Sequence, residues 1–235
     1  MNGIIEKIRA DLRLFADEKT RLQGERFFKE DIKLYGLKAA RVTELAKTYF
    51  KLIPERSKKK VFELCEELWR SGYAEEGFIA CEWSYSVRKE YVRDDFAVFG
   101  RWVHKYITNW ATCDTLCNHT VGTFIEMYPE FISDLKKWAH SDNRWVKRAS
   151  AVSFIVPARK GMFLNDIFEI ADILHSDSDD MVRKGYGWML KAASQSHQKE
   201  VFDYVMKRKA TMPRTSLRYA IEKMPQELKK LAMAR

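Results

Sequence analysis

The chain has 235 residues, of which 46% are hydrophobic and 32% are charged, and its formal net charge at pH 7 is +9. This composition is typical of a soluble globular protein, and the lack of a membrane-spanning apolar run and of a signal-peptide layout argues against membrane and secreted proteins, so we expect a cytoplasmic one. The positive charge favours a polyanionic partner, nucleic acid before an acidic membrane surface, although many basic proteins bind no polyanion.

Apolar residues recur at helical spacing along the chain, and no useful stretch alternates as a β-strand does. The spacing predicts helices within residues 4–15, 61–68, 78–87, 96–106, 116–125 and 131–138. Pro54 precedes the second of these helices, and Tyr128-Pro129 ends the fifth. We therefore expect an all-α protein.

The second half of the sequence repeats itself. Val146-Lys147-Arg148-Ala149 and Val182-Arg183-Lys184-Gly185 lie 36 residues apart, and a weaker copy begins at Leu217, 35 residues later. N-cap residue types precede the first two copies, at 141–143 and 178–180. A helix pair repeated at this period is typical of an α-solenoid of HEAT type. We predict one such domain over residues 1–235, and an ordinary helical bundle is the alternative.

Alternate helices of a solenoid line the same face. Helices beginning near residues 110, 144 and 179 alternate here with helices beginning near residues 130, 162 and 199. The first set should therefore share one layer. If that layer is concave, Asp114, Arg148 and Trp188 converge on it and form part of a DNA-binding face.

The types of these residues suggest a chemistry. Trp110 and Asp114 are four residues apart and so share a helix face, and Asn109 already takes the N-cap position. An alkylated purine carries positive charge and leaves without a general acid. A carboxylate can stabilise the oxocarbenium-like sugar and orient water, aromatic faces attract the cation, and an arginine can hold a phosphate. Asp114, Trp110 with Trp188, and Arg148 would fill these roles.

Each candidate also has a structural interpretation. Asp114 would gain from the helix dipole, Trp188 could belong to the core, and Arg148 could pair with an acid on an adjacent helix. The four cysteines fit a reducing compartment. Two of them, Cys113 and Cys117, lie near His119 but lack the paired Cys-x-x-Cys spacing, so we expect no metal and no cofactor.

The sequence resembles the HEAT-like-repeat DNA alkylation repair glycosylases, the AlkD family, over nearly its whole length. The matching motifs are Asn109-Trp110-x-x-x-Asp114, Pro129-Glu130-Phe131-Ile132, Trp138-x-x-Ser141-Asp142-Asn143-x-Trp145-x-x-Arg148-Ala149 and Gly187-Trp188-x-Leu190. The order and spacing of the motifs carry the resemblance, because each alone is weak.

The resemblance implies an all-α fold of HEAT-like helix pairs and cofactor-free hydrolysis of the N-glycosidic bond of N3- and N7-alkylated purines, such as 3-methyladenine and 7-methylguanine. It implies that Asp114 is the catalytic carboxylate, that Trp110 and Trp188 are the aromatic contacts, and that Arg148 contacts a phosphate. One position departs from the family, because Phe27 and Phe28 stand where we expect a tyrosine. The other residues expected to contact DNA are Lys147, Arg183, Lys184 and Lys191.

Three functions are therefore compared. The first is a monomeric DNA glycosylase that acts on double-stranded DNA carrying alkylated bases, without strand cleavage because no lyase nucleophile is evident. The second is a non-catalytic protein that binds branched or distorted DNA, which the missing tyrosine hydroxyl favours. The third is a protein-interaction scaffold, against which the net charge counts.

Overall fold

The computed structural model describes residues 3–234, and over this range the chain is built of α-helices with short connections. Within the same range β-pairing is confined to an isolated bridge between Lys33 and Tyr73. None of the helices in the described part of the chain is long and apolar enough to cross a membrane. The helices confirm the predicted all-α class. The fold divides into two compact units, 1–116 and 117–235, which are described in turn.

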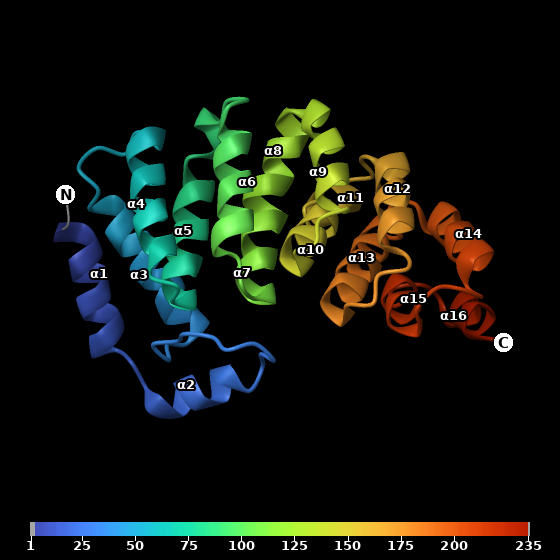
Figure 1. Ribbon diagram of the computed structural model, residues 1–235, viewed down its shortest axis with the longest axis horizontal. Helices are drawn as coiled ribbons and strands as arrows, with labels where there is room; N and C mark the ends of the chain where they lie inside the picture. The colour runs from blue at the N-terminus through green and yellow to red at the C-terminus, as the bar shows by residue number, and fades with distance from the viewer. Residues whose placement is uncertain (1–2, 235) are drawn as a thin grey trace. The chain divides into compact units, whose positions relative to one another are not determined.

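Unit 1 is a stack of amphipathic helices around α5. Helices α3 and α4 both pack on α5, while α1 packs on α3 and α4, and α7 packs on α5 (Figure 1). The apolar stripe of α4, which includes Val61, Leu64 and Leu68, is buried against these neighbours. The helices of this unit are α1 (Gly3–Leu14), α2 (Glu18–Glu25), α3 (Ala39–Lys51), α4 (Lys58–Arg70), α5 (Ala74–Ser86), the 3-10 turn η1 (Arg88–Glu90), α6 (Asp95–Tyr106) and α7 (Trp110–Thr115).

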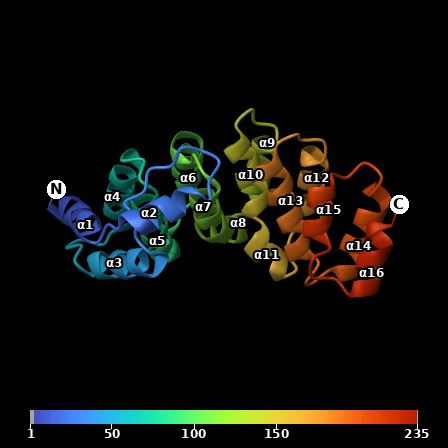
Figure 2. The same ribbon diagram turned by 90° about the horizontal axis from the view of Figure 1, so that it is seen from below.

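Unit 2 consists of alternating helices in two layers. Helices α10, α13 and α15 pack in succession on one another, and Figure 2 shows them as neighbours. Helices α9, α12 and α14 intervene in the sequence, as the repeat predicted. The helices are α8 (Gly122–Met127), the 3-10 turn η3 (Pro129–Phe131), α9 (Ile132–Trp138), α10 (Arg144–Val152), α11 (Ile155–Arg159), α12 (Leu164–Leu174), α13 (Asp180–Ala193), α14 (Gln198–Arg208), α15 (Arg214–Ala220) and α16 (Gln226–Met233).

The predicted N-caps of the repeated helices are confirmed. Asn109 accepts a hydrogen bond from the backbone N–H of Thr112 at 3.0 Å, and Asn143 accepts one from Trp145 at 2.8 Å. Asp179 accepts from the backbone N–H groups of Met181 and Val182. Each cap satisfies donors that the first turn of a helix leaves without partners. The three caps fix where α7, α10 and α13 begin.

Candidate functional site

Asp114 lies in the second turn of α7 and is buried, with 9% of its surface exposed. It is the fifth residue of the helix, beyond the first turn in which the helix dipole favours a carboxylate. Immediately after α7 the chain widens into a π-helix, η2 (Leu116–Val121). Widened turns of this kind occur often at functional sites. The helix dipole therefore accounts poorly for the position of Asp114 on α7.

Trp110, one helical turn before Asp114, packs against an aromatic ring from a distant part of the sequence. The rings of Phe28 and Trp110 are stacked, with centroids 5.3 Å apart and planes inclined by 20°. Both rings line a cavity of about 250 Å³, together with Phe27, Phe78 and Ala111. Phe27 is 76% exposed, whereas Phe28 is partly buried. Of the two phenylalanines, Phe28 takes the place beside Trp110, and its ring carries no hydroxyl.

The loop that carries Phe28 is held by a buried carboxylate that was not among the residues predicted from the sequence. Glu75, on the first turn of α5, accepts hydrogen bonds from the backbone N–H groups of Tyr35 at 3.1 Å, Gly36 at 2.9 Å and Leu37 at 3.3 Å. Gly36 has a positive φ of 96°, and a Cβ there would lie 2.4 Å from the carbonyl oxygen of Asp17. The carboxylate and the glycine together fix the turn that ends this loop.

The neighbouring Glu76 is fully buried and joins the same loop to α1. It accepts hydrogen bonds from the guanidinium of Arg9, at 3.1–3.3 Å, and from the hydroxyl of Tyr35, at 2.9 Å. Burial and the hydrogen bond to Glu76 raise the pKa of Tyr35 well above its usual range. The sequence signal for both carboxylates was two adjacent acids at the start of an otherwise mostly apolar helix, 74–86.

In unit 2, Arg148 joins α10 to α13. Its side chain is largely buried, and Nη1 donates a hydrogen bond of 2.5 Å to the backbone carbonyl of Met181. A Cβ on Gly185 would lie 3.3 Å from Cγ of Arg148, so the absence of a side chain there gives the arginine room. This hydrogen bond joins two helices through a carbonyl acceptor, and the pairing of Arg148 with an acid on an adjacent helix stays an interpretation. Its contact with a phosphate stays a prediction.

Trp188 lies on α13 and is half-buried. The preceding Gly187 is where α13 crosses α15, because a Cβ there would lie 2.8 Å from Cβ of Tyr219 and 2.9 Å from the carbonyl oxygen of Ser216. Ser216 also donates a hydrogen bond from Oγ to the carbonyl of Arg183, at 3.0 Å. The close crossing fixes the position of the turn that carries Trp188 relative to α15.

The four other cations expected to contact DNA all have partners within unit 2. Lys147 pairs with Asp177, and Arg183 donates from Nε to the carbonyl of Asp177 at 2.6 Å. The ammonium group of Lys184 lies 2.7 Å from Asp180, and that of Lys191 lies 3.0 Å from Glu222. Each carboxylate lowers the local positive potential that a phosphate would meet.

The structure thus brings Trp110 together with Phe28 in unit 1, and Arg148 together with α13, the helix of Trp188, in unit 2. The convergence of these two groups on one surface stays a prediction. Cys113 and Cys117 are buried, and among residues 3–234 no group of three or more His, Cys, Asp or Glu side chains is arranged to hold a metal ion.

Comparison with known proteins gives a consistent family match. Residues 8–224 match the model of a family described as DNA alkylation repair enzyme. A structure described as a predicted DNA alkylation repair enzyme from Enterococcus faecalis superposes with a TM-score of 0.77 at 13% sequence identity. The alignment covers 89% of this chain and 97% of that chain, so the similarity shows a shared fold. Among curated proteins, none matches the sequence.

Proposed function

The chain belongs to the DNA alkylation repair enzyme family, and on that premise we propose that it is a DNA glycosylase. Its substrates are N3- and N7-alkylated purines in double-stranded DNA, such as 3-methyladenine and 7-methylguanine. The reaction is hydrolysis of the N-glycosidic bond, with Asp114 as the catalytic carboxylate and no metal or cofactor.

The observation that carries the proposal is the placement of Asp114. It is a buried carboxylate on the same short helix as Trp110, whose ring is stacked on Phe28 beside a cavity. Burial removes water from around this carboxylate. A carboxylate in a water-poor environment also interacts more strongly with a developing positive charge. Both facts fit a residue placed for electrostatic catalysis.

The proposed chemistry needs one carboxylate. The bond from the sugar C1′ to the purine nitrogen breaks, and its electron pair neutralises the positive charge of the alkylated base, which leaves without a proton donor. Asp114 stabilises the oxocarbenium-like sugar and orients a water molecule, whose oxygen bonds to C1′. The water proton passes to Asp114 or to solvent. The products are the free alkylated base and an abasic site in an uncut strand.

The remaining candidates bind rather than react. The aromatic rings of Trp110 and Trp188 attract the cationic nucleotide. Arg148 and the cations of α10 and α13 are already paired, so we assign them a weaker share of DNA binding. We expect the protein to act as a monomer in the cytoplasm.

A base-release assay tests this proposal. Wild-type protein should release 7-methylguanine and 3-methyladenine from methylated duplex DNA. Asp114→Asn, which keeps the shape of the side chain, should release them about 10²–10³-fold more slowly, as expected when an electrostatic stabiliser is lost. DNA binding by this variant should survive. The matched control is Asp203→Asn, an exposed carboxylate on α14 that pairs with Lys199. Lack of release by the wild type would refute the enzymatic function.

A second function is favoured by one observation, the phenylalanine ring beside Trp110. A ring without a hydroxyl retains stacking but makes no hydrogen bond, and this fits a protein that binds branched or distorted DNA without excising bases. Phe28→Tyr separates the two functions. The second function predicts that the wild type binds DNA junctions tightly but releases negligible base. A large gain in base release by Phe28→Tyr would then show that the missing hydroxyl keeps the wild type from excising bases.

A further inference from the structure

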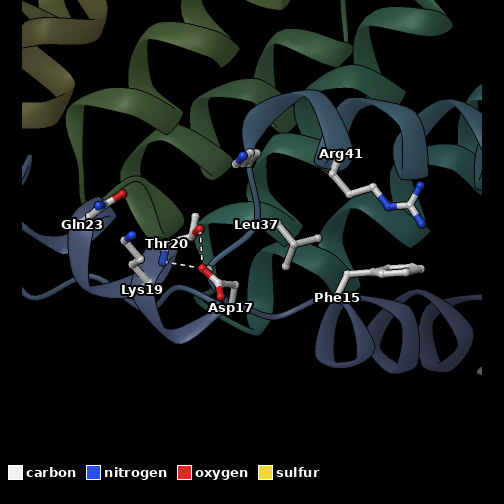
Figure 3. Close-up of a pocket in the computed structure, with 9 residues that line it drawn as sticks. Phe15, Asp17, Lys19, Thr20, Gln23, Leu37 and Arg41 are labelled. Carbon is white, nitrogen blue, oxygen red and sulfur yellow. Dashed lines mark hydrogen bonds between the residues drawn. The ribbon is translucent and has the colours of Figure 1, made fainter.

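Beside the aromatic cavity, unit 1 has a hollow of about 620 Å³ at the junction of α1, α2 and α3. Its lining includes three cations, Lys19, Lys38 and Arg41, and a single carboxylate, Asp17. In Figure 3, Lys19 and Gln23 lie on one side, Arg41 and Phe15 lie on the other, and Leu37 lies between them. The hollow is therefore open, mainly positive at its rim and partly apolar at its floor.

The cations of the hollow differ in their partners. Arg41 is held in place, because its guanidinium lies 3.9 Å above the ring of Phe15 and pairs with Glu44 at 2.6 Å. The ammonium groups of Lys19 and Lys38 form no hydrogen bond or ion pair with any other residue of the range 3–234. These two ammonium groups can bind a ligand without breaking an interaction within the protein.

Asp17 places a single negative charge among these three cations. Its Oδ1 accepts hydrogen bonds from the backbone N–H of Thr20 at 2.7 Å and from the hydroxyl of Thr20 at 2.6 Å, which is the cap of α2. These hydrogen bonds, aided by the charges of Lys19 and Lys38, lower the pKa of Asp17. Asp17 is therefore engaged as a helix cap, and its interaction with both lysines shows that they share one neighbourhood.

The hollow adjoins the aromatic cavity. Thr20, Gly36 and Leu37 line both, so the two concavities are separated only by the turn that Glu75 holds. Phe28 and Trp110 line the cavity on one side of this turn, and Lys19 and Lys38 line the hollow on the other. A nucleic-acid strand has the matching layout, with bases on one side and charged phosphates on the other.

We propose that the phosphodiester backbone of DNA lies in this hollow, with Lys19 and Lys38 each neutralising one phosphate, while a nucleotide of the same strand faces Phe28 and Trp110. The proposal rests on the DNA partner of the proposed function, but it does not depend on catalysis. It places phosphate contacts of unit 1 on α2 and at the start of α3, where none was predicted from the sequence.

The test is the salt dependence of DNA binding by the full-length protein. Each lost phosphate contact reduces the slope of log K against log salt concentration by about 0.9. The double variant Lys19→Ala/Lys38→Ala should therefore lose about 1.8 from the wild-type slope. The matched control is Lys47→Ala/Lys51→Ala, which removes two exposed lysines of α3 outside the hollow and changes the net charge equally. The control should keep the wild-type slope.

The outcomes separate this proposal from the proposed function. An unchanged slope in the Lys19/Lys38 variant, or an equal loss in both double variants, overturns the phosphate site while DNA binding and base release by the wild type still stand. If the wild type binds DNA but releases no base, the enzymatic function fails and the phosphate site is still tested by the slopes.

Discussion

Replacement of Glu75 by alanine is the sharpest test of how the Phe28 loop is held. The carboxylate accepts three backbone hydrogen bonds from residues 35–37, and its loss leaves three N–H groups without their acceptor. Gly36 is buried, so leaving its N–H without an acceptor costs about 1.5–3 kcal/mol of stability. Tyr35 and Leu37 are partly exposed, so the same loss at their N–H groups costs about 0.5–1 kcal/mol each. We expect Glu75→Ala to lower the free energy of unfolding by about 2.5–5 kcal/mol.

Urea unfolding measures this loss, and Glu63→Ala is the matched control. Glu63 is an exposed residue of α4 that pairs with Lys60 at 3.3 Å, so its removal should change stability by less than about 1 kcal/mol. Hydrogen exchange adds a local measurement, because the amides of residues 35–37 should lose protection in Glu75→Ala. Glu75→Gln retains one acceptor oxygen and should lose about half as much stability as the alanine variant.

A loss below about 1 kcal/mol in Glu75→Ala, or amides of residues 35–37 that stay protected, would refute the role assigned to this carboxylate. The effect on function is measured separately. If Glu75 positions the Phe28 loop, Glu75→Gln should raise the KM for DNA more than it lowers kcat, because Asp114 stays in place and the aromatic contact loosens.

Two further predictions concern packing and pH. Gly187→Ala should destabilise the protein by about 1–2 kcal/mol, because the new Cβ meets Ser216 and Tyr219 within 3 Å. Gly185→Ala should destabilise it less, because the new Cβ meets only the side chains of Arg148 at 3.3 Å and Val152 at 3.7 Å, and alanine favours the helix. Equal changes in Tm would contradict the close crossing of α13 and α15. Burial alone would raise the pKa of Glu66, but hydrogen bonds from Tyr106 and Trp102 outweigh it and lower the pKa below 4.5. Its contribution to stability is therefore complete above pH 4.5 and is lost as the pH falls through the lower folded-state pKa. The urea midpoints of wild type and Glu66→Gln should converge as the pH falls below 4.5, and a constant difference would contradict this.

The parts of the fold that follow from local physics could be predicted from the sequence. The caps Asn109, Asn143 and Asp179 are local signals, because each side chain satisfies a donor two or three residues away. The repeat in the second half is visible for a similar reason, since each helix pair buries its apolar stripe against the next copy. These local signals are sufficient to place Asp114 on a helix that begins after Asn109.

The features of the fold and of the site that were not predicted from the sequence depend mostly on contacts between residues far apart in the sequence. Glu75 holds a turn about forty positions away, and the stack of Phe28 on Trp110 joins segments twice as distant. Between residues 15 and 61 no helix was predicted from the sequence. Helix α2 gives a weak signal because none of its residues is buried, and it is held by the Asp17 cap and by ion pairs of Arg21. Helix α3 has a regular apolar stripe that includes Val42 and Leu45, so spacing alone would have found it.

Net charge is a poor guide to which cations contact DNA when the ion-pair partners of those cations are unknown. Lysines and arginines of the repeated helices were selected by their position, yet Lys147, Lys184 and Lys191 each face a carboxylate. A partly exposed ion pair such as Lys184–Asp180 contributes only about 0–1 kcal/mol, so exchange of its carboxylate for a phosphate costs little, but the displaced carboxylate stays nearby and repels the phosphate. Lys19 and Lys38 form no ion pair of this kind among the described residues, and Asp17, the carboxylate beside them, is held by Thr20 as the cap of α2. The formal charge of +9 thus overstates the positive charge that the paired lysines of unit 2 present to DNA. Lys19 and Lys38, on α2 and at the start of α3, can neutralise phosphates and so release counterions from DNA without breaking an ion pair.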